Sequence, residues 1–144
     1  MANDEHVAML KKGVTAWNRW RGEDPYVDHP DLSGENLTKA HLPLANLIGV
    51  NLTGANLTEA MLFRANLSGA NLSGANLTKA LLPMANLTGA NLTGAILSEA
   101  DLLQANLSGA NLTRATITQA QLDLACGDPS TKLPPGRTIA PCKK

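Results

Sequence analysis

The histidine, serine and threonine side chains are the first candidates in this chain for catalysis or metal binding. The three histidines, His6, His29 and His41, lie in three different segments. No His-x-x-x-His or Cys/His spacing typical of zinc ligands links them. The many serines and threonines recur at one fixed position of a repeat and have no paired base, which a nucleophile would need. The sequence therefore predicts no catalytic residue, no metal site and no cofactor.

The two cysteines, Cys126 and Cys142, lie close to the C-terminus. They could form one disulfide but not a disulfide framework. Such a bond would close a loop of about 17 residues and stabilise the fold by roughly 3 kcal/mol through the unfolded chain.

Composition and charge exclude several classes of partner. The chain has 144 residues, with 12 basic residues balancing 12 acidic ones, and its pI is about 6.8. A neutral chain offers neither a basic surface for nucleic acid nor an acidic surface that imitates DNA. No stretch approaches the roughly 18 to 20 apolar residues of a membrane span, and residues 1–10 do not resemble a signal peptide. We expect a soluble chain with no nucleic acid, membrane or small-molecule substrate, cytoplasmic if Met1 is the native start.

From residue 30 to residue 124 the chain repeats every five residues with the pattern A-N-L-[ST]-x, as in Ala55 to Glu59. The central position is leucine or isoleucine in all nineteen repeats, and the position two before it is alanine in sixteen. A period of five fits neither an amphipathic helix nor an alternating strand. The chain must therefore turn every five residues.

The fifth position of the repeat has a longer period of twenty residues. Its second column reads Lys39, Glu59, Lys79, Glu99. This period predicts a four-sided coil, with leucine and alanine inside and successive coils stacked at about 4.8 Å. The alternating charges of this column predict a ladder of ion pairs along one edge. Glycine in the columns of Gly34 and Gly49 suits the positive φ of a type II turn, so the bulky residues in the other two columns predict a second turn geometry.

The segments before and after the repeats are expected to cap the two ends of the stack, whose sheet edges would otherwise be exposed. Val7, Leu10, Val14 and Trp17 have helical spacing within residues 4–21, with Asn3 or Asp4 as the cap and Gly22 and Pro25 as stops. The glycine- and proline-rich tail predicts an irregular cap, with Leu133 and Ile139 as plugs. The expected organisation is an N-terminal capping helix and linker (1–29), a β-helix (30–124) and a C-terminal capping tail (125–144).

Nineteen copies of this unit over residues 30–124 resemble the pentapeptide-repeat protein family. The resemblance implies an all-β solenoid, a right-handed quadrilateral β-helix of about five coils. The segment from Leu10 to Arg21 and the tail from Cys126 to Cys142 resemble the flanks of members abundant in cyanobacteria. In those members the tail cysteines form a disulfide pair, sometimes in exported proteins, which implies the periplasm or thylakoid lumen as an alternative location. The best understood members imitate DNA and bind type II topoisomerases through strong negative charge, which this chain lacks.

One side of the coil departs from the repeat. On the third side, asparagine and the hydroxyl residues are absent through four coils, and apolar residues replace them. The predicted partner face is Pro43, Leu44, Met61, Phe63, Leu81, Pro83, Met84 and Leu103. Patches of this kind usually mark contacts with a partner or a second copy. Cover by the N-terminal linker, or drift in a permissive side, would also explain them.

The sequence thus favours a non-enzymatic protein-binding or scaffold protein that acts through this face. Regulation of a topoisomerase by DNA mimicry is the alternative, and the zero net charge opposes it.

Overall fold

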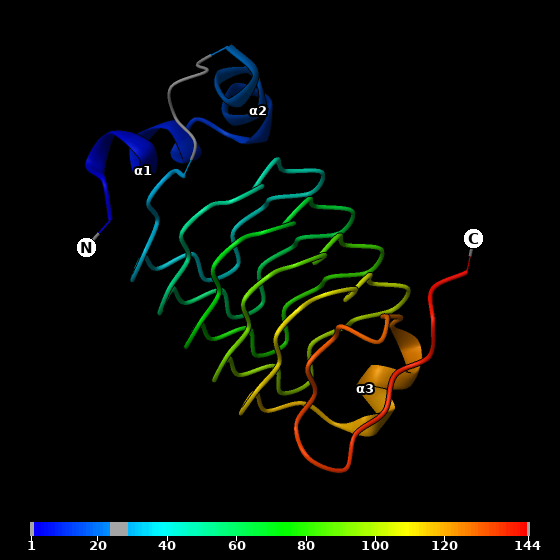
Figure 1. The fold of residues 1–144 in the computed structure, drawn as a ribbon. Helices are drawn as coiled ribbons and strands as arrows, with labels where there is room; N and C mark the ends of the chain where they lie inside the picture. The colour runs from blue at the N-terminus through cyan, green and yellow to red at the C-terminus, as the bar shows by residue number, and fades with distance from the viewer. Residues whose placement is uncertain (1, 24–28, 144) are drawn as a thin grey trace.

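The computed structural model describes residues 2–23 and 29–143. Its centre is a stack of four-sided coils, with helices at both ends (Figure 1). Parallel bridges join residues twenty apart, from Asp31 and Asn51 at one end to Ile96 and Thr116 at the other. Each side is too short to form an extended strand, so the sheet consists of single bridges. The predicted quadrilateral β-helix is confirmed.

Backbone hydrogen bonds join each coil to the next. The Asn56 N–H donates to the Glu35 carbonyl of the coil before it, at 2.9 Å, and the Asn56 carbonyl accepts from the Leu37 N–H at 2.7 Å. Inside the coil, the central leucines and the alanines are shielded from solvent, as Leu72 and Ala75 show with no exposed surface. No polar or charged residue of the described chain belongs to this core.

The asparagine of the repeat organises each side locally. The Asn56 Oδ1 accepts from the backbone N–H of Thr58 at 3.0 Å and from the Thr58 hydroxyl at 2.6 Å. This closed loop between an asparagine and the residue two positions on is an Asx turn. The A-N-L-[ST] pattern therefore has a structural cause at each position.

The corners have one geometry, so the prediction of two turn types was wrong. A hydrogen bond from the Ala55 N–H to the Leu52 carbonyl closes one such turn, and its third residue, Gly54, has a φ of 65°. Non-glycine corners have a similar φ, such as 59° at Lys79 and 57° at Met84. The repeating hydrogen bonds on both sides hold these residues in the left-handed region despite a cost of roughly 1 kcal/mol each.

Of the charge ladder, one step forms an ion pair in the described residues. The Lys79 Nζ lies 3.9 Å from the Glu99 Oε2, and both side chains are largely exposed. The other predicted steps do not come within that distance.

The N-terminal cap is two helices, α1 (Asp4–Lys11) and α2 (Val14–Glu23), where the sequence predicted one. Gly13 separates them with a φ of 106°, which a continuous helix cannot contain. Asn3 caps α1 as predicted. Trp17 is fully buried against the first coil. The prediction of Gly22 as a stop was wrong, because α2 continues through it to Glu23. The predicted stop at Pro25 lies outside the described residues.

The last predicted repeat is the helix α3 (Gln119–Leu124) instead of a coil side. Thr118 and Gln121 form a capping box that starts this helix. The Asx turn is missing here because Gln121 and Asp123 stand where the repeat has asparagine and a hydroxyl residue. Leu122 nevertheless stays fully buried, and the chain returns to the stack at Cys126, paired with Asn106.

The tail closes the C-terminal end. Cys126 and Cys142 form the predicted disulfide, with their Cα atoms 4.7 Å apart. Gly127 and Pro141 form a parallel bridge beside it. Leu133 and Ile139 pack against the core, as predicted for plugs.

A pair of substitutions tests the inward and outward assignment. Leu72→Asp is expected to abolish folding because it buries an unpaired carboxylate, which costs several kcal/mol. Asn71→Asp should be nearly silent, since the new side chain keeps the oxygen that accepts from the Ser73 N–H at 3.0 Å. Thermal unfolding followed by circular dichroism measures both. Similar melting temperatures for the two variants would contradict the assignment.

A second pair tests the corner conformation. Gly74 has a φ of 66°, and a Cβ there would meet no atom within 4 Å. Gly74→Ala should therefore lower the free energy of unfolding by about 1 kcal/mol through backbone strain alone. Gly22→Ala, in α2 and equally free of neighbours, should raise it by about 0.5 kcal/mol. Urea denaturation distinguishes the signs, and equal destabilisation by both changes would refute the corner geometry.

Candidate interaction face

The third side of the stack carries the predicted partner face. Parallel bridges stack His41, Met61, Leu81 and Asp101 directly over one another. We call the eight predicted residues on and beside this column the apolar face: Pro43, Leu44, Met61, Phe63, Leu81, Pro83, Met84 and Leu103.

Most of the large side chains of the apolar face are open to solvent. The exposed fractions are Leu44 59%, Phe63 42%, Leu81 43%, Met84 43% and Leu103 45%. Pro43, Met61 and Pro83 are half-buried between them. The structure therefore brings the predicted residues together on one surface.

Proline makes the loss of asparagine tolerable in the first and third coils of this side. Pro43 and Pro83 stand at the second position of their turns, where φ near −65° is favoured. Proline also has no backbone N–H. In other repeats the asparagine side chain accepts a hydrogen bond from the N–H at this position, so a proline here needs no such acceptor. In the fourth coil, Asp101 replaces asparagine and accepts from the Leu103 N–H at 3.0 Å. The apolar residues are thus compatible with the fold and are not required by it.

The sequence prediction of the face omitted Leu124. This residue ends α3 and is 53% exposed, one coil beyond Gln104 in the column of Leu44 and Met84. The twenty-residue spacing from Met84 through Gln104 is the signal that could have found it.

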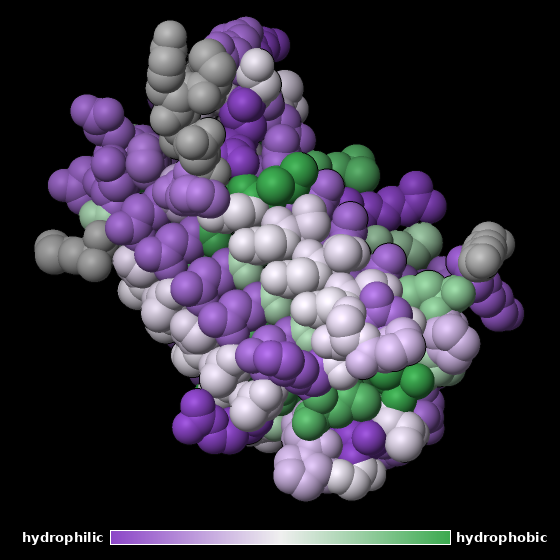
Figure 2. Space-filling model, viewed as in Figure 1, coloured by the Kyte–Doolittle hydropathy of each residue, from purple (hydrophilic) through white to green (hydrophobic). Residues whose placement is uncertain are grey.

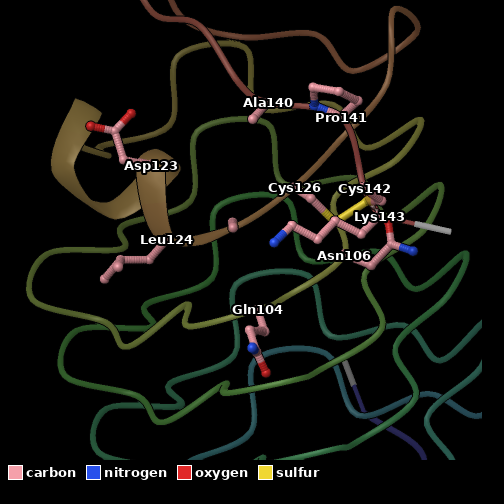
Figure 3. Close-up of a pocket in the computed structure, with 10 residues that line it drawn as sticks. Gln104, Asn106, Asp123, Leu124, Cys126, Ala140, Pro141, Cys142 and Lys143 are labelled. Atoms are coloured by element: carbon pink, nitrogen blue, oxygen red, sulfur yellow. Dashed lines mark hydrogen bonds between the residues drawn. A yellow bond between two sulfur atoms is a disulfide. The ribbon is translucent and has the colours of Figure 1, made fainter.

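A pocket of about 530 Å³ lies at the C-terminal end of the face. Gln104 and Leu124 line it together with the disulfide and Lys143. Figure 3 shows Cys142 beside Asn106, and the Cys142 Sγ lies 3.4 Å from the Asn106 Oδ1. The pocket lies between α3, the tail and the last coil.

The N-terminal helices contact the first coil and leave the face open. Asn18 of α2 donates from its Nδ2 to the Leu44 carbonyl at 3.1 Å, yet the Leu44 side chain remains exposed. No segment among residues 2–23 and 29–143 lies over Phe63, Leu81 or Met84, which stay about two-fifths exposed. Figure 2 shows one side of the molecule, where hydrophilic residues dominate the N-terminal helices and hydrophobic residues gather beneath them and beside the C-terminal cap.

The histidines have separate surroundings. The Asp31 N–H donates to the His6 Nδ1 at 2.9 Å, the His29 Nδ1 lies 3.2 Å from the Gly49 carbonyl, and His41 is exposed on the third side. In the described chain, no three residues of metal-binding type cluster together. Nor does any helix of that part have the length and hydrophobicity to cross a bilayer.

Two carboxylates are held in their charged form by local hydrogen bonds. The Ser33 hydroxyl and N–H lower the pKa of Asp31, and the Ser130 hydroxyl and the Gly109 N–H lower that of Asp128. Asp128 thereby joins the tail to the last coil, since its Oδ1 accepts from Gly109 at 3.0 Å. The Asp31 carboxylate instead accepts from the Ser33 N–H at 2.9 Å, within its own turn of the first coil.

Comparison with known proteins places these features in a family. The family model for pentapeptide repeats matches residues 31–69, 40–78, 70–108 and 97–126. No curated protein matches the chain by sequence.

Several solved structures resemble the chain. A pentapeptide repeat protein, Rfr23, from the cyanobacterium Cyanothece 51142 is 27% identical, with 81% of this chain and 97% of that chain covered and a TM-score of 0.58. The protein alr5209 from Nostoc PCC 7120 is 36% identical, with 72% and 78% covered and a TM-score of 0.30. QnrB1, a plasmid-mediated fluoroquinolone resistance protein, is 17% identical, with 76% and 65% covered and a TM-score of 0.50.

The last of these likenesses shows the fold alone. The family model covers two thirds of the sequence and coincides with the stacked coils and their inward leucines. The chain therefore belongs to the pentapeptide repeat family.

Proposed function

We propose that this protein is a non-enzymatic binding or scaffold protein whose apolar face contacts a protein partner or a second copy of itself. The observation that carries the proposal is the set of five large hydrophobic side chains exposed together on the third side of the stack. Burying the exposed half of each such side chain is worth about 1 kcal/mol. A contact over the whole face would therefore gain several kcal/mol without any movement of the backbone.

The stack suits this role because it is rigid. Every inner coil bonds to two neighbours through backbone groups, so the side chains of the apolar face are held at fixed spacing. A preorganised surface loses little conformational entropy on binding.

The charge of the chain supports a hydrophobic contact over DNA mimicry. A DNA mimic needs a strongly acidic surface, whereas this chain has a net charge of zero. The likeness to QnrB1 concerns the fold and does not alter this argument.

The Cys126–Cys142 disulfide favours an oxidising compartment, such as the periplasm or thylakoid lumen, over the cytoplasm.

A double substitution tests the apolar face. Phe63→Glu with Met84→Glu is expected to abolish association, because it places two charges in the centre of the contact. The melting temperature should change little, since both side chains point outward. Sedimentation velocity measures self-association, and affinity capture from a native lysate compares the proteins retained by each form.

The matched control is Ile96→Glu with Thr116→Glu. These two residues are exposed, bridge to each other on the second side and add the same charge. The control should associate like the unmodified protein. Association that survives the Phe63 and Met84 changes, or that is lost equally in the control, would contradict the proposed face.

A further inference from the structure

The N-terminal helices close two of the four sides of the first coil. On the first side, the Asp31 N–H donates to the His6 Nδ1 at 2.9 Å, and the Asp31 carbonyl accepts from the Asn3 N–H at 3.0 Å. On the fourth side, the Asn46 N–H donates to the Asn18 Oδ1, and its carbonyl accepts from the Trp17 Nε1, both at 2.7 Å. Side chains and backbone of the cap thus replace a missing coil on these sides.

Residues 2–23 and 29–143 provide no such replacement on the second and third sides. The backbone N–H and carbonyl groups of Asn36 and His41 make no hydrogen bond within the described chain. One coil further on, Met61 occupies the position of His41, and both of its backbone groups are paired at 2.9 and 2.8 Å. The core is also open here, because Leu37 and Ala40 are half-buried while their equivalents in the next coil are fully buried. An unpaired edge of this kind is a template for a further strand.

A groove lies along the open third side. It has a volume of about 640 Å³ and runs between the start of α2 and the first coil. Val14 and Thr15 form one wall, while His41, Pro43 and Leu44 form the other. We call it the edge groove.

The chain segments that line the edge groove carry charge of one sign. The charged residues within two positions of its lining residues are Lys11, Lys12, Arg19 and Lys39, with no aspartate or glutamate among them. This excess of four cations stands out in a chain whose net charge is zero. A second copy of the chain would bring the same cations face to face, so charge disfavours self-pairing at this edge.

We propose that the edge groove binds an extended acidic peptide segment as an added strand. The backbone of the segment pairs with the free N–H and carbonyl of His41, which is the β-augmentation mode of peptide recognition. An apolar side chain of the segment contacts Val14 and Pro43, and its carboxylates lie among the surrounding lysines. The edge groove shares Pro43 and Leu44 with the apolar face, but the other members of that face, among them Phe63 and Met84, lie in later coils and do not line the groove.

Three labelled hexapeptides test the proposal by fluorescence anisotropy on the full chain. The first alternates glutamate and valine, the second alternates lysine and valine, and the third is the glutamate peptide with every backbone amide N-methylated. We expect the first to bind and the other two to bind at least tenfold more weakly. Equal binding of the N-methylated peptide would overturn strand pairing, and equal binding of the lysine peptide would overturn the acidic preference. Absence of binding by the glutamate peptide would overturn the whole proposal.

A charge-reversed variant locates the site. Lys11→Glu with Lys12→Glu should weaken binding of the glutamate peptide at least tenfold. The matched change is Lys132→Glu with Lys143→Glu, at the other end of the stack, and it should leave this binding unchanged. Equal weakening by both variants would contradict a local site.

A single-stranded DNA dodecamer that binds more tightly than the glutamate peptide would show that the cations bind nucleic acid instead. The Phe63 and Met84 double variant should bind the peptide normally, so failure of the apolar face and failure of the groove are distinguishable.

Discussion

Hydrogen bonding between residues twenty positions apart is the interaction on which the rest of this structure depends. Each coil supplies the backbone partners of the next, and each buried leucine packs on the leucines above and below it. A single side is too short to be stable alone, so stability comes from stacking. The two ends of the stack are the least stable part of this arrangement, because backbone groups and core leucines there have no next coil to pair with or pack against.

The two ends of the stack are capped in different ways. At the C-terminal end, α3 occupies one side, and the tail pairs with Gly127 and is fixed by the disulfide. At the N-terminal end, α1 and α2 satisfy the first and fourth sides through His6, Asn18 and Trp17, and no described residue pairs with the other two sides. The apolar face and the edge groove thus arise from different causes. The face consists of outward side chains that the repeat does not require, whereas the groove results from incomplete capping.

The repeat made most of the fold predictable, because the period of five, the period of twenty and the inward leucines are all visible as residue types. Features that depend on competition between local structures were harder to predict from the sequence. The prediction of two corner geometries was wrong because residues such as Met84 adopt a positive φ that their type disfavours, and only the stacked hydrogen bonds impose it. The break at Gly13 and the helix at Gln119–Leu124 have recognisable signals in a glycine and a capping box, which the regular spacing concealed. The open backbone of His41 depends on where α2 lies, and the spacing of residues does not contain that information.

Residue-resolved amide hydrogen exchange by NMR is the most direct test of the stacking account. Amides at the asparagine position of inner coils, such as Asn71 and Asn91, donate to the coil before them and should exchange slowly. The amides of Asn36 and His41 should exchange as fast as free peptide amides, while those of Asp31 and Asn46 should be protected by the N-terminal helices. Slow exchange at Asn36 and His41 would show that the first coil is closed, and fast exchange at Asn71 would contradict the stacked β-helix itself.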